Sequence, residues 1–465
     1  MLDLSVAERR PAPSLLGAIL LLLLTYVDRW ITGIVPGIGQ WQPTLLYVLT
    51  VGLVLVYVLV TWSTDPSAST SMKRRARTRC TMLMTTIIAL NVLLPMGFFI
   101  HDRLVRGPYP QNVIDWPLQI EAGSNLLLQS KSPYGYDYAL TEMKLWSERA
   151  NFPGNPALHH AIHLPMNFLL AAVVLPVWRA LFGWTDARIL LIPAYVLVIV
   201  FAPRLCDRWE DGHALRIILA LNPILVDSFE VGLSDYLLLA LLIATFTLRR
   251  SGRTRAAAAM LGVAVATRQF SWLLVPAYLA AEWWTLPEQP IRVHVGALTR
   301  RVWPLFAVVS AVILPFLLLD GRNFYADVIA FGSGGVTDAY PIGGLNTFGI
   351  SAFVAFLQQG LGYRFTFPWM LVQLAAVLPV LGYTIVLQCR HNTLRRLVLS
   401  YGVVLAIFMF TGRFMHTNYL GFLFAILVLA YFTADTPLNA PRPESTTLGV
   451  EHGTTLMTHL TIQGT

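Results

Sequence analysis

Long apolar segments separated by charged or turn residues dominate the chain. About thirteen of them are candidate membrane helices: 12–31, 43–62, 80–100, 161–182, 187–203, 214–231, 234–249, 256–268, 270–286, 303–319, 366–388, 397–411 and 418–433. A helix needs about 20 apolar residues to cross a hydrocarbon core of about 30 Å. The pattern therefore predicts an all-α fold, a polytopic transmembrane helical bundle of about 11–13 spans. The first run has no small-residue cleavage site, so we expect a retained helix and not a signal peptide.

The composition narrows the class of protein further. Hydrophobic residues make up 56% of the 465 residues and charged residues 12%, against about 45–50% and about 25% in soluble domains. An ordinary soluble enzyme is therefore excluded, and we expect a multi-pass integral protein of the cell membrane. The net charge of +8 is read as a topology signal and does not imply nucleic-acid binding. The 3 cysteines are widely spaced, so neither disulfides nor a zinc site is expected.

Basic clusters predict which side of the membrane each loop occupies. Short cytoplasmic loops collect Lys and Arg, and such clusters lie at 73–79, 249–255, 292–301 and 390–396. This orientation makes the polar stretch 102–160 extracytoplasmic. Four apolar runs separate this stretch from the cluster at 249–255, an even number that would leave the cluster outside, so one of the runs does not cross the membrane. The runs 161–182 and 214–231 are the candidates, because each contains Pro. The sequence alone does not decide between them.

The same pattern predicts three regions. Residues 1–79 form an N-terminal two-helix extension with a basic cytoplasmic loop, and residues 80–433 form the main transmembrane domain. Residues 434–465 are polar and rich in Thr and Pro, so we expect a disordered tail. The Gly-rich stretch 331–346 predicts a mobile loop, followed by a surface helix near 346–360.

The extracytoplasmic stretch 102–160 is the first candidate for an active site, because loops of this length usually have a function. Asp115 precedes a predicted helix that Pro117 begins and that continues to Leu128. A carboxylate fixed there can accept a proton from a substrate hydroxyl, or it can simply cap the helix. Glu121 and Asp137 are candidates for a second carboxylate or for metal ligands, and the alternative for both is solvated surface charge.

Two basic positions on the same side are candidates for anion binding. Arg268 and Gln269 lie in a turn between two apolar runs, and an arginine at the membrane edge needs an anionic partner. That partner could be a lipid phosphate or an acidic side chain of the protein. Arg413, His416 and Asn418 form a second group. The spacing of His159 and His163 is only weak support for a metal site. Nucleotide-binding and serine-hydrolase motifs are absent from the sequence.

Several segments resemble the polytopic GT-C glycosyltransferases, which include the polyprenyl-phosphate-mannose-dependent mannosyltransferases. The resemblance covers most of residues 80–433. The segments that carry it are Asp115 with Glu121-Ala122-Gly123, Leu126 to Tyr134, Leu221-Asn222-Pro223-Ile224, Gly232-Leu233-Ser234-Asp235, and Leu261 to Gln269 with Pro276. The chain departs from the pattern at Gln129 and Ser130, at His163-Leu164-Pro165-Met166, and by two additional N-terminal helices.

The resemblance implies an inverting transfer of a sugar, with mannose favoured, from a polyprenyl-phosphate donor to a glycan or glycolipid acceptor. Asp115 would be the general base, with Glu121 as a second catalytic carboxylate. Arg268 would hold the donor phosphate, and Gln269, Arg413, His416, Asn418 and Tyr134 would also bind substrate. No cofactor is certain, and a divalent cation is compatible with the resemblance. The alternatives are a transporter or flippase of lipid-linked sugars, and a membrane scaffold that binds a partner through its outer loop.

Overall fold

The computed structural model describes residues 41–62, 69–152, 154–340, 342, 348–363 and 365–438. All the regular elements within these residues are helices, and the one β contact among them is an isolated bridge between Thr393 and Pro437. The α-helices are α2 (Trp41–Trp62), α3 (Thr70–Ile88), α4 (Leu94–Arg106), α5 (Asp115–Leu128), α6 (Glu142–Arg149), α7 (Pro165–Phe182), α8 (Leu191–Phe201), α9 (Trp209–Ala220), α10 (Pro223–Val231), α11 (Asp235–Arg250), α12 (Thr254–Val265), α13 (Leu274–Trp283), α14 (Ile291–Tyr325), α15 (Phe331–Ser333), α16 (Ile350–Ala355), α17 (Trp369–Arg390), α18 (Leu394–Thr411) and α19 (Thr417–Phe432).

Short 3-10 and π segments join or extend these helices. They are η2 (Ala89–Leu93), η3 (Tyr138–Leu140), η4 (Pro156–Leu158), η5 (Ala187–Leu190), η6 (Ala202–Leu205), η7 (Gln269–Leu273), η8 (Ala326–Ala330) and η9 (Phe356–Gly360). The expected surface helix near 346–360 corresponds to α16 and η9. The predicted run 12–31 and most of the predicted tail lie outside the described residues.

Among the described residues, 6 helices are long and apolar enough to cross a membrane. They are Thr70–Arg106, Pro165–Phe182, Ala187–Leu205, Ile291–Ser333, Trp369–Arg390 and Leu394–Thr411. The pair α10 and α11 passes the same test together, which raises the number to 7. The chain is therefore a multi-pass membrane protein. The number is lower than the predicted 11–13 because several apolar helices, such as Thr254–Val265 and Thr417–Phe432, have only 10–17 residues.

The interruption expected in one of two Pro-containing runs lies in 214–231. This run is not one continuous helix. α9 stops at Ala220, and the Asn222 side chain caps a new helix, α10, that begins at Pro223. At Gly232, whose φ is +108°, the chain turns again, and α10 and α11 are bent by 117°. In contrast, α7 continues through Pro176 without a break. This part of the chain therefore forms a broken span or a re-entrant segment.

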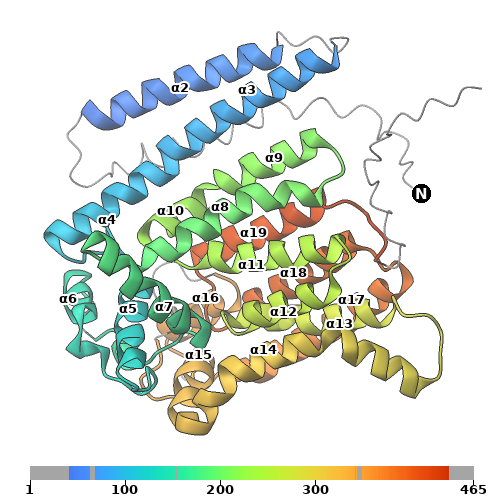
Figure 1. The fold of residues 1–465 in the computed structure, drawn as a ribbon. Coiled ribbons are helices and arrows are strands. Elements are labelled where there is room, and N and C mark those ends of the chain that lie inside the picture. Colours follow the sequence, from blue (N-terminus) through green and yellow to red (C-terminus); the bar gives the residue numbers. More distant parts are fainter. Residues whose placement is uncertain are drawn as a thin grey trace, which may run out of the picture.

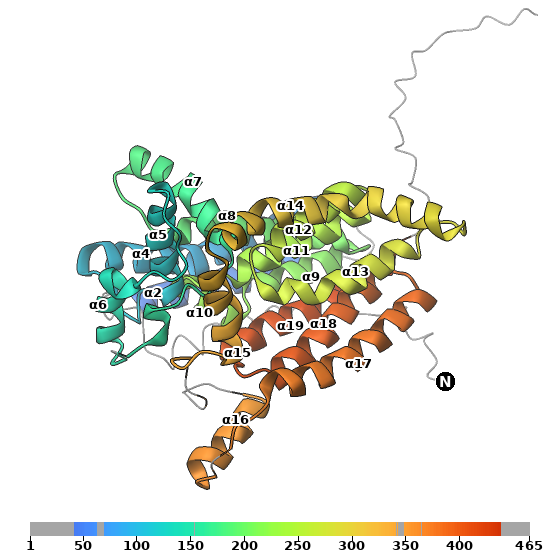
Figure 2. The ribbon, with the colours of Figure 1, turned by 90° about the horizontal axis from the view of Figure 1, so that it is seen from below.

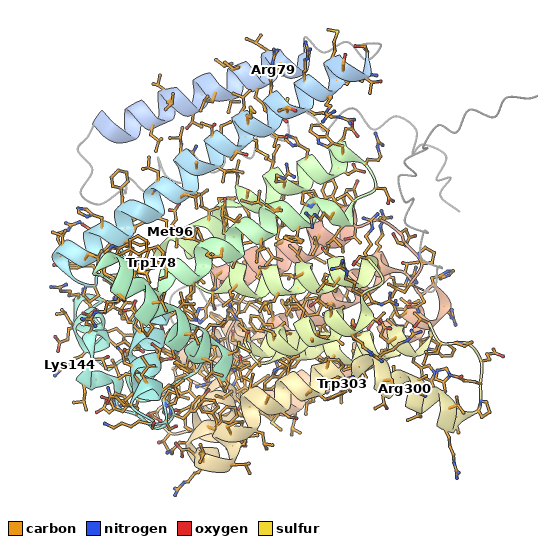
Figure 3. All side chains as sticks on the ribbon, viewed as in Figure 1. Arg79, Met96, Lys144, Trp178, Arg300 and Trp303 are labelled. Atoms are coloured by element: carbon orange, nitrogen blue, oxygen red, sulfur yellow. The ribbon has the colours of Figure 1, made fainter. Side chains whose placement is uncertain are left out.

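The helices form one elongated bundle with an additional layer at one end. In Figure 1, α8, α11, α12, α18 and α19 run along the bundle, and α5, α6 and α7 gather at its left end. Figure 2 shows α17, α18 and α19 side by side and α16 projecting away from the bundle. Lys144 lies at the left end and Arg300 toward the right (Figure 3). Lys144 belongs to the polar stretch 102–160, and Arg300 belongs to the basic cluster 292–301, which we expect to be cytoplasmic. These two residues therefore lie toward opposite ends of the bundle.

Close backbone approach holds the centre of the bundle together. α12 packs on both α11 and α14, and a Cβ at Gly262 would lie only 2.7 Å from the Leu305 carbonyl oxygen. Small residues allow such approach between membrane helices, where packing replaces the hydrophobic effect. In contrast, only 11% of the apolar window of α14 and of α17 is buried within the protein. These two helices present most of their apolar surface outward, as expected for lipid-facing spans.

Residues 434–438 lie against the end of the bundle. The Ala434 amide donates to the Leu205 carbonyl at 2.8 Å, and the Leu394 amide donates to the Thr436 carbonyl at 3.0 Å. Arg249 Nη2 donates to the Leu438 carbonyl at 3.0 Å. The first residues of the predicted tail are therefore tied to the bundle through the backbone groups of Ala434, Thr436 and Leu438.

Candidate functional site

Asp115 is the first residue of α5 at the outer end of the bundle. The preceding residue, Ile114, is extended, and its amide donates to the Val231 carbonyl at 2.8 Å, which places the start of α5 beside the end of α10. The Asp115 carboxylate accepts hydrogen bonds from its own amide and that of Trp116, while burial raises its pKa to about 6. No ion pair to Asp115 occurs in the described part of the chain. The carboxylate is thus not neutralised by a described cation, and a carboxylate of raised pKa can act as a general base.

Segments distant in the sequence meet around this carboxylate. Asp115 lies within electrostatic range of the hydroxyl groups of Tyr340, from the segment after α15, and Tyr419, from α19. Tyr419 is also within range of Arg268 and Asp235. Asp115 and Arg268 therefore both lie near Tyr419 in the first turn of α19.

Arg268 is ion-paired within the protein. Its Nη1 lies 2.6 Å from Oδ1 of Asp235, which begins α11 and is only 1% exposed. Asn418 Nδ2 donates to the other Asp235 oxygen at 3.1 Å. The Arg268 guanidinium also lies 4.8 Å from the ring centroid of Phe270. Of the two partners considered for Arg268, the structure shows the acidic side chain, supplied from the bend between α10 and α11.

Arg413 has different partners. Its Nη2 donates to the Tyr340 carbonyl at 2.5 Å, and its guanidinium lies 4.9 Å from the Phe414 ring centroid. Its Nη1 is buried without a hydrogen-bond partner among the described residues. His416 stacks on Phe414 with ring centroids 6.0 Å apart, and burial lowers the pKa of His416. In the described part of the chain, the hydrogen-bond and ring partners of Arg413 are thus neutral groups.

Three other predicted site residues have structural contacts. Glu121 accepts hydrogen bonds from Arg103 at 2.8 and 2.6 Å and from the Ala187 amide at 2.6 Å. These bonds tie α5 to α4 and η5, so we leave Glu121 out of the proposed chemistry. Tyr134 is buried and donates to the His163 carbonyl at 3.0 Å. Gln269 donates to the Val328 carbonyl at 3.4 Å.

The three neighbouring histidines point to different partners. His159 lies 3.2 Å from Asp137, while His160 lies 2.7 Å from Asp327 and 3.0 Å from Asp338. Burial and the nearby Arg268 guanidinium lower the pKa of His163 to about 3, so its ring is neutral. No group of three or more His, Cys, Asp or Glu side chains that could hold a metal ion occurs within the described residues.

Sequence reasoning assigned no role to Asp235, Tyr340 or Asp327. Asp235 is the buried partner of Arg268, and Tyr340 contacts both Arg413 and Asn155. Asp327 accepts from the amides of Gly135 and Ala161 and from His160. An acidic residue at the start of an apolar run was the available signal for Asp235, because a carboxylate at such depth requires a partner. No comparable signal marks Tyr340 within its Gly-rich segment.

Comparison of the chain with protein-family models and with curated proteins finds no match.

Proposed function

We propose that the protein is a membrane glycosyltransferase. It would transfer a sugar, with mannose favoured, from a polyprenyl-phosphate donor to a hydroxyl of a glycan or glycolipid acceptor on the extracytoplasmic face. The observation that carries the proposal is Asp115, a carboxylate without an ion pair in the described residues, held at the start of α5 near Arg268 and Arg413. The resemblance of residues 80–433 to GT-C enzymes supports the same reaction class.

The residues can serve the two ends of such a reaction. The acceptor oxygen attacks the anomeric carbon, and its proton passes to the Asp115 carboxylate. The bond between the anomeric carbon and the phosphate oxygen breaks, and the phosphate leaves with the electron pair. Because negative charge develops on that phosphate, a fixed cation near it stabilises the transition state. A single displacement of this kind inverts the configuration at the anomeric carbon.

The proposal is tested with purified protein and a panel of radiolabelled polyprenyl-phosphate sugars. We expect one donor to give a glycosylated product, and Asp115→Asn to reduce the rate by about 100-fold or more, the usual contribution of a positioned base. Ser124→Ala on the same helix, which removes only a local bond to the Glu121 carbonyl, is the matched control. An Asp115→Asn variant with full activity would exclude the catalytic assignment.

A transporter or flippase of lipid-linked sugars is the second candidate. The observation that favours it is the 117° bend between α10 and α11, with the Asp235–Arg268 pair directly after it, because transporters often place binding groups at broken helices. Movement of a fluorescent polyprenyl-phosphate sugar across proteoliposomes, with no product in the transfer assay, would support this candidate over the enzyme.

A further inference from the structure

The two arginines of the outer site differ in how their charge is balanced. Arg268 lies 2.6 Å from the carboxylate of Asp235, and that carboxylate also accepts from Asn418. An arginine and a carboxylate at hydrogen-bond distance form a pair with no net charge. The Asp235 side chain is 1% exposed, so removing Arg268 from it would leave a buried unpaired carboxylate. Arg268 is therefore committed to the protein.

Arg413 has no such counter-charge. Its described hydrogen-bond partner is the neutral Tyr340 carbonyl, and its Nη1 is buried without a partner in the described residues. The guanidinium lies close against Gly334, where an added Cβ would be only 2.9 Å from its Cζ. The sequence from Pro341 to Thr347, which follows Tyr340, contains no acidic residue. A buried donor on a cation carries a free-energy cost until an acceptor, preferably an anion, pairs with it.

We propose that Arg413 binds the phosphate group of the substrate, and that Arg268 with Asp235 is a neutral structural pair. This inference rests on the proposed function, which identifies the substrate that carries the phosphate. It assigns phosphate binding to Arg413, whereas the family resemblance implies Arg268. One further feature suits an anion. α19 begins at Thr417, four residues after Arg413, and a helix N-terminus favours negative charge.

The position of Arg413 relative to Asp115 also fits a transfer reaction. Tyr340 accepts from Arg413 through its carbonyl, and its hydroxyl lies within electrostatic range of Asp115. One residue thus separates the cation from the base. A donor bound beside Tyr340 would contact Arg413 with its phosphate, while the hydroxyl of the separate acceptor molecule faces Asp115.

The test measures binding of polyprenyl monophosphate and of inorganic phosphate to the full chain in lipid nanodiscs, without any sugar. Arg413→Gln should weaken binding about 10- to 100-fold, the range for a charge-assisted hydrogen bond. Arg413→Lys should have a smaller effect, because it keeps the charge but loses the planar donor pair. The matched control is the double variant Asp235→Asn with Arg268→Gln, which removes the other pair as a neutral unit and should change affinity less than about 3-fold.

Binding of both ligands, each weakened by Arg413→Gln, would show recognition of the phosphate group itself. Binding of the lipid phosphate alone, with the same dependence on Arg413, would show that the lipid is its source. The proposal is overturned if Arg413→Gln binds like the wild type, or if the double variant loses as much affinity as Arg413→Gln.

A second measurement uses the wild-type protein, so the test does not depend on the folding of the variants. Phenylglyoxal modifies accessible arginines, and mass spectrometry locates each adduct. Polyprenyl monophosphate should protect Arg413 from modification, and absence of protection at a saturating concentration overturns the assignment. Failure of the proposed function is distinguishable, because phosphate binding through Arg413 without sugar transfer would reject the enzyme and retain the anion site.

Discussion

Asp115 gives the outer site a defined pH dependence. Its pKa is raised to about 6 by burial, and only the ionised carboxylate can accept the proton of an acceptor hydroxyl. The rate should therefore be constant well above pH 6 and fall about 10-fold per pH unit below it. Initial rates of transfer between pH 4.5 and 8 measure this directly. A profile that is flat between pH 5 and 7 would contradict the assignment of Asp115 as the base.

Glu121 and Glu142 allow a matched comparison, since both pair with Arg103. Glu121 is 16% exposed and bonded at 2.6 Å, whereas Glu142 is 66% exposed and 3.2 Å away. Glu121→Gln should destabilise the fold by about 3 kcal/mol, because it leaves part of a buried charge network unpaired. Glu142→Gln should cost less than about 1 kcal/mol. Thermal unfolding of the two variants provides the measurement, and equal losses would show that burial does not set the difference.

At the level of single residues, the sequence singled out charged candidates but did not identify their partners. Asp115, Arg268 and Arg413 were singled out by charge at the edge of apolar runs, and the structure brings them to one end. The partner of Arg268 was left open between a lipid phosphate and a protein carboxylate. Asp235 is 33 residues away, and its approach depends on the bend at Gly232, which hydropathy does not report.

At the scale of the helices, the bend between α10 and α11 depends on Gly232. Gly232 has φ of +108°, and a Cβ there would lie 2.4 Å from Pro117 Cγ in the first turn of α5. Gly232→Ala should therefore cost about 2 kcal/mol or more and reduce transfer by displacing Asp115. Gly154→Ala is the control, because a Cβ there meets nothing within 4 Å. Thermal unfolding and the transfer assay on both variants test this, and a Gly232→Ala variant as stable and active as the control would refute it.

The elements also show where prediction from the pattern ends. The turn at Arg268 and Gln269 between two apolar runs is confirmed by α12, η7 and α13. Of the two Pro-containing runs considered for an interruption, the break falls in 214–231, where the Asn222 side chain caps a new helix that begins at Pro223. α7 continues through Pro176, so a proline alone does not decide where a helix ends. The number of long helices was overestimated, because apolar runs buried among other helices have the same hydropathy as runs that face lipid.

At the scale of the whole molecule, the orientation in the membrane is open to a direct test. Lys144 and Arg300 are exposed and lie toward opposite ends of the bundle (Figure 3). In a background with Cys80, Cys206 and Cys389 replaced by Ser, Lys144→Cys should react with a membrane-impermeant maleimide added outside intact cells. Arg300→Cys should react only after the membrane is permeabilised, because Arg-rich loops remain in the cytoplasm. Reaction of both sites in intact cells would contradict this topology.

The contacts of residues 434–438 have a consequence for the order in which the protein is assembled. Ala434, Thr436 and Leu438 bond to Leu205, Leu394 and Arg249, and the ribosome makes this segment after every helix of the bundle. Bonds between it and the ends of η6, α11 and α18 can therefore form only once all of those helices have been synthesised. Nascent chains that stop at α19 would lack these bonds, so membrane insertion can be complete before this end of the bundle is closed.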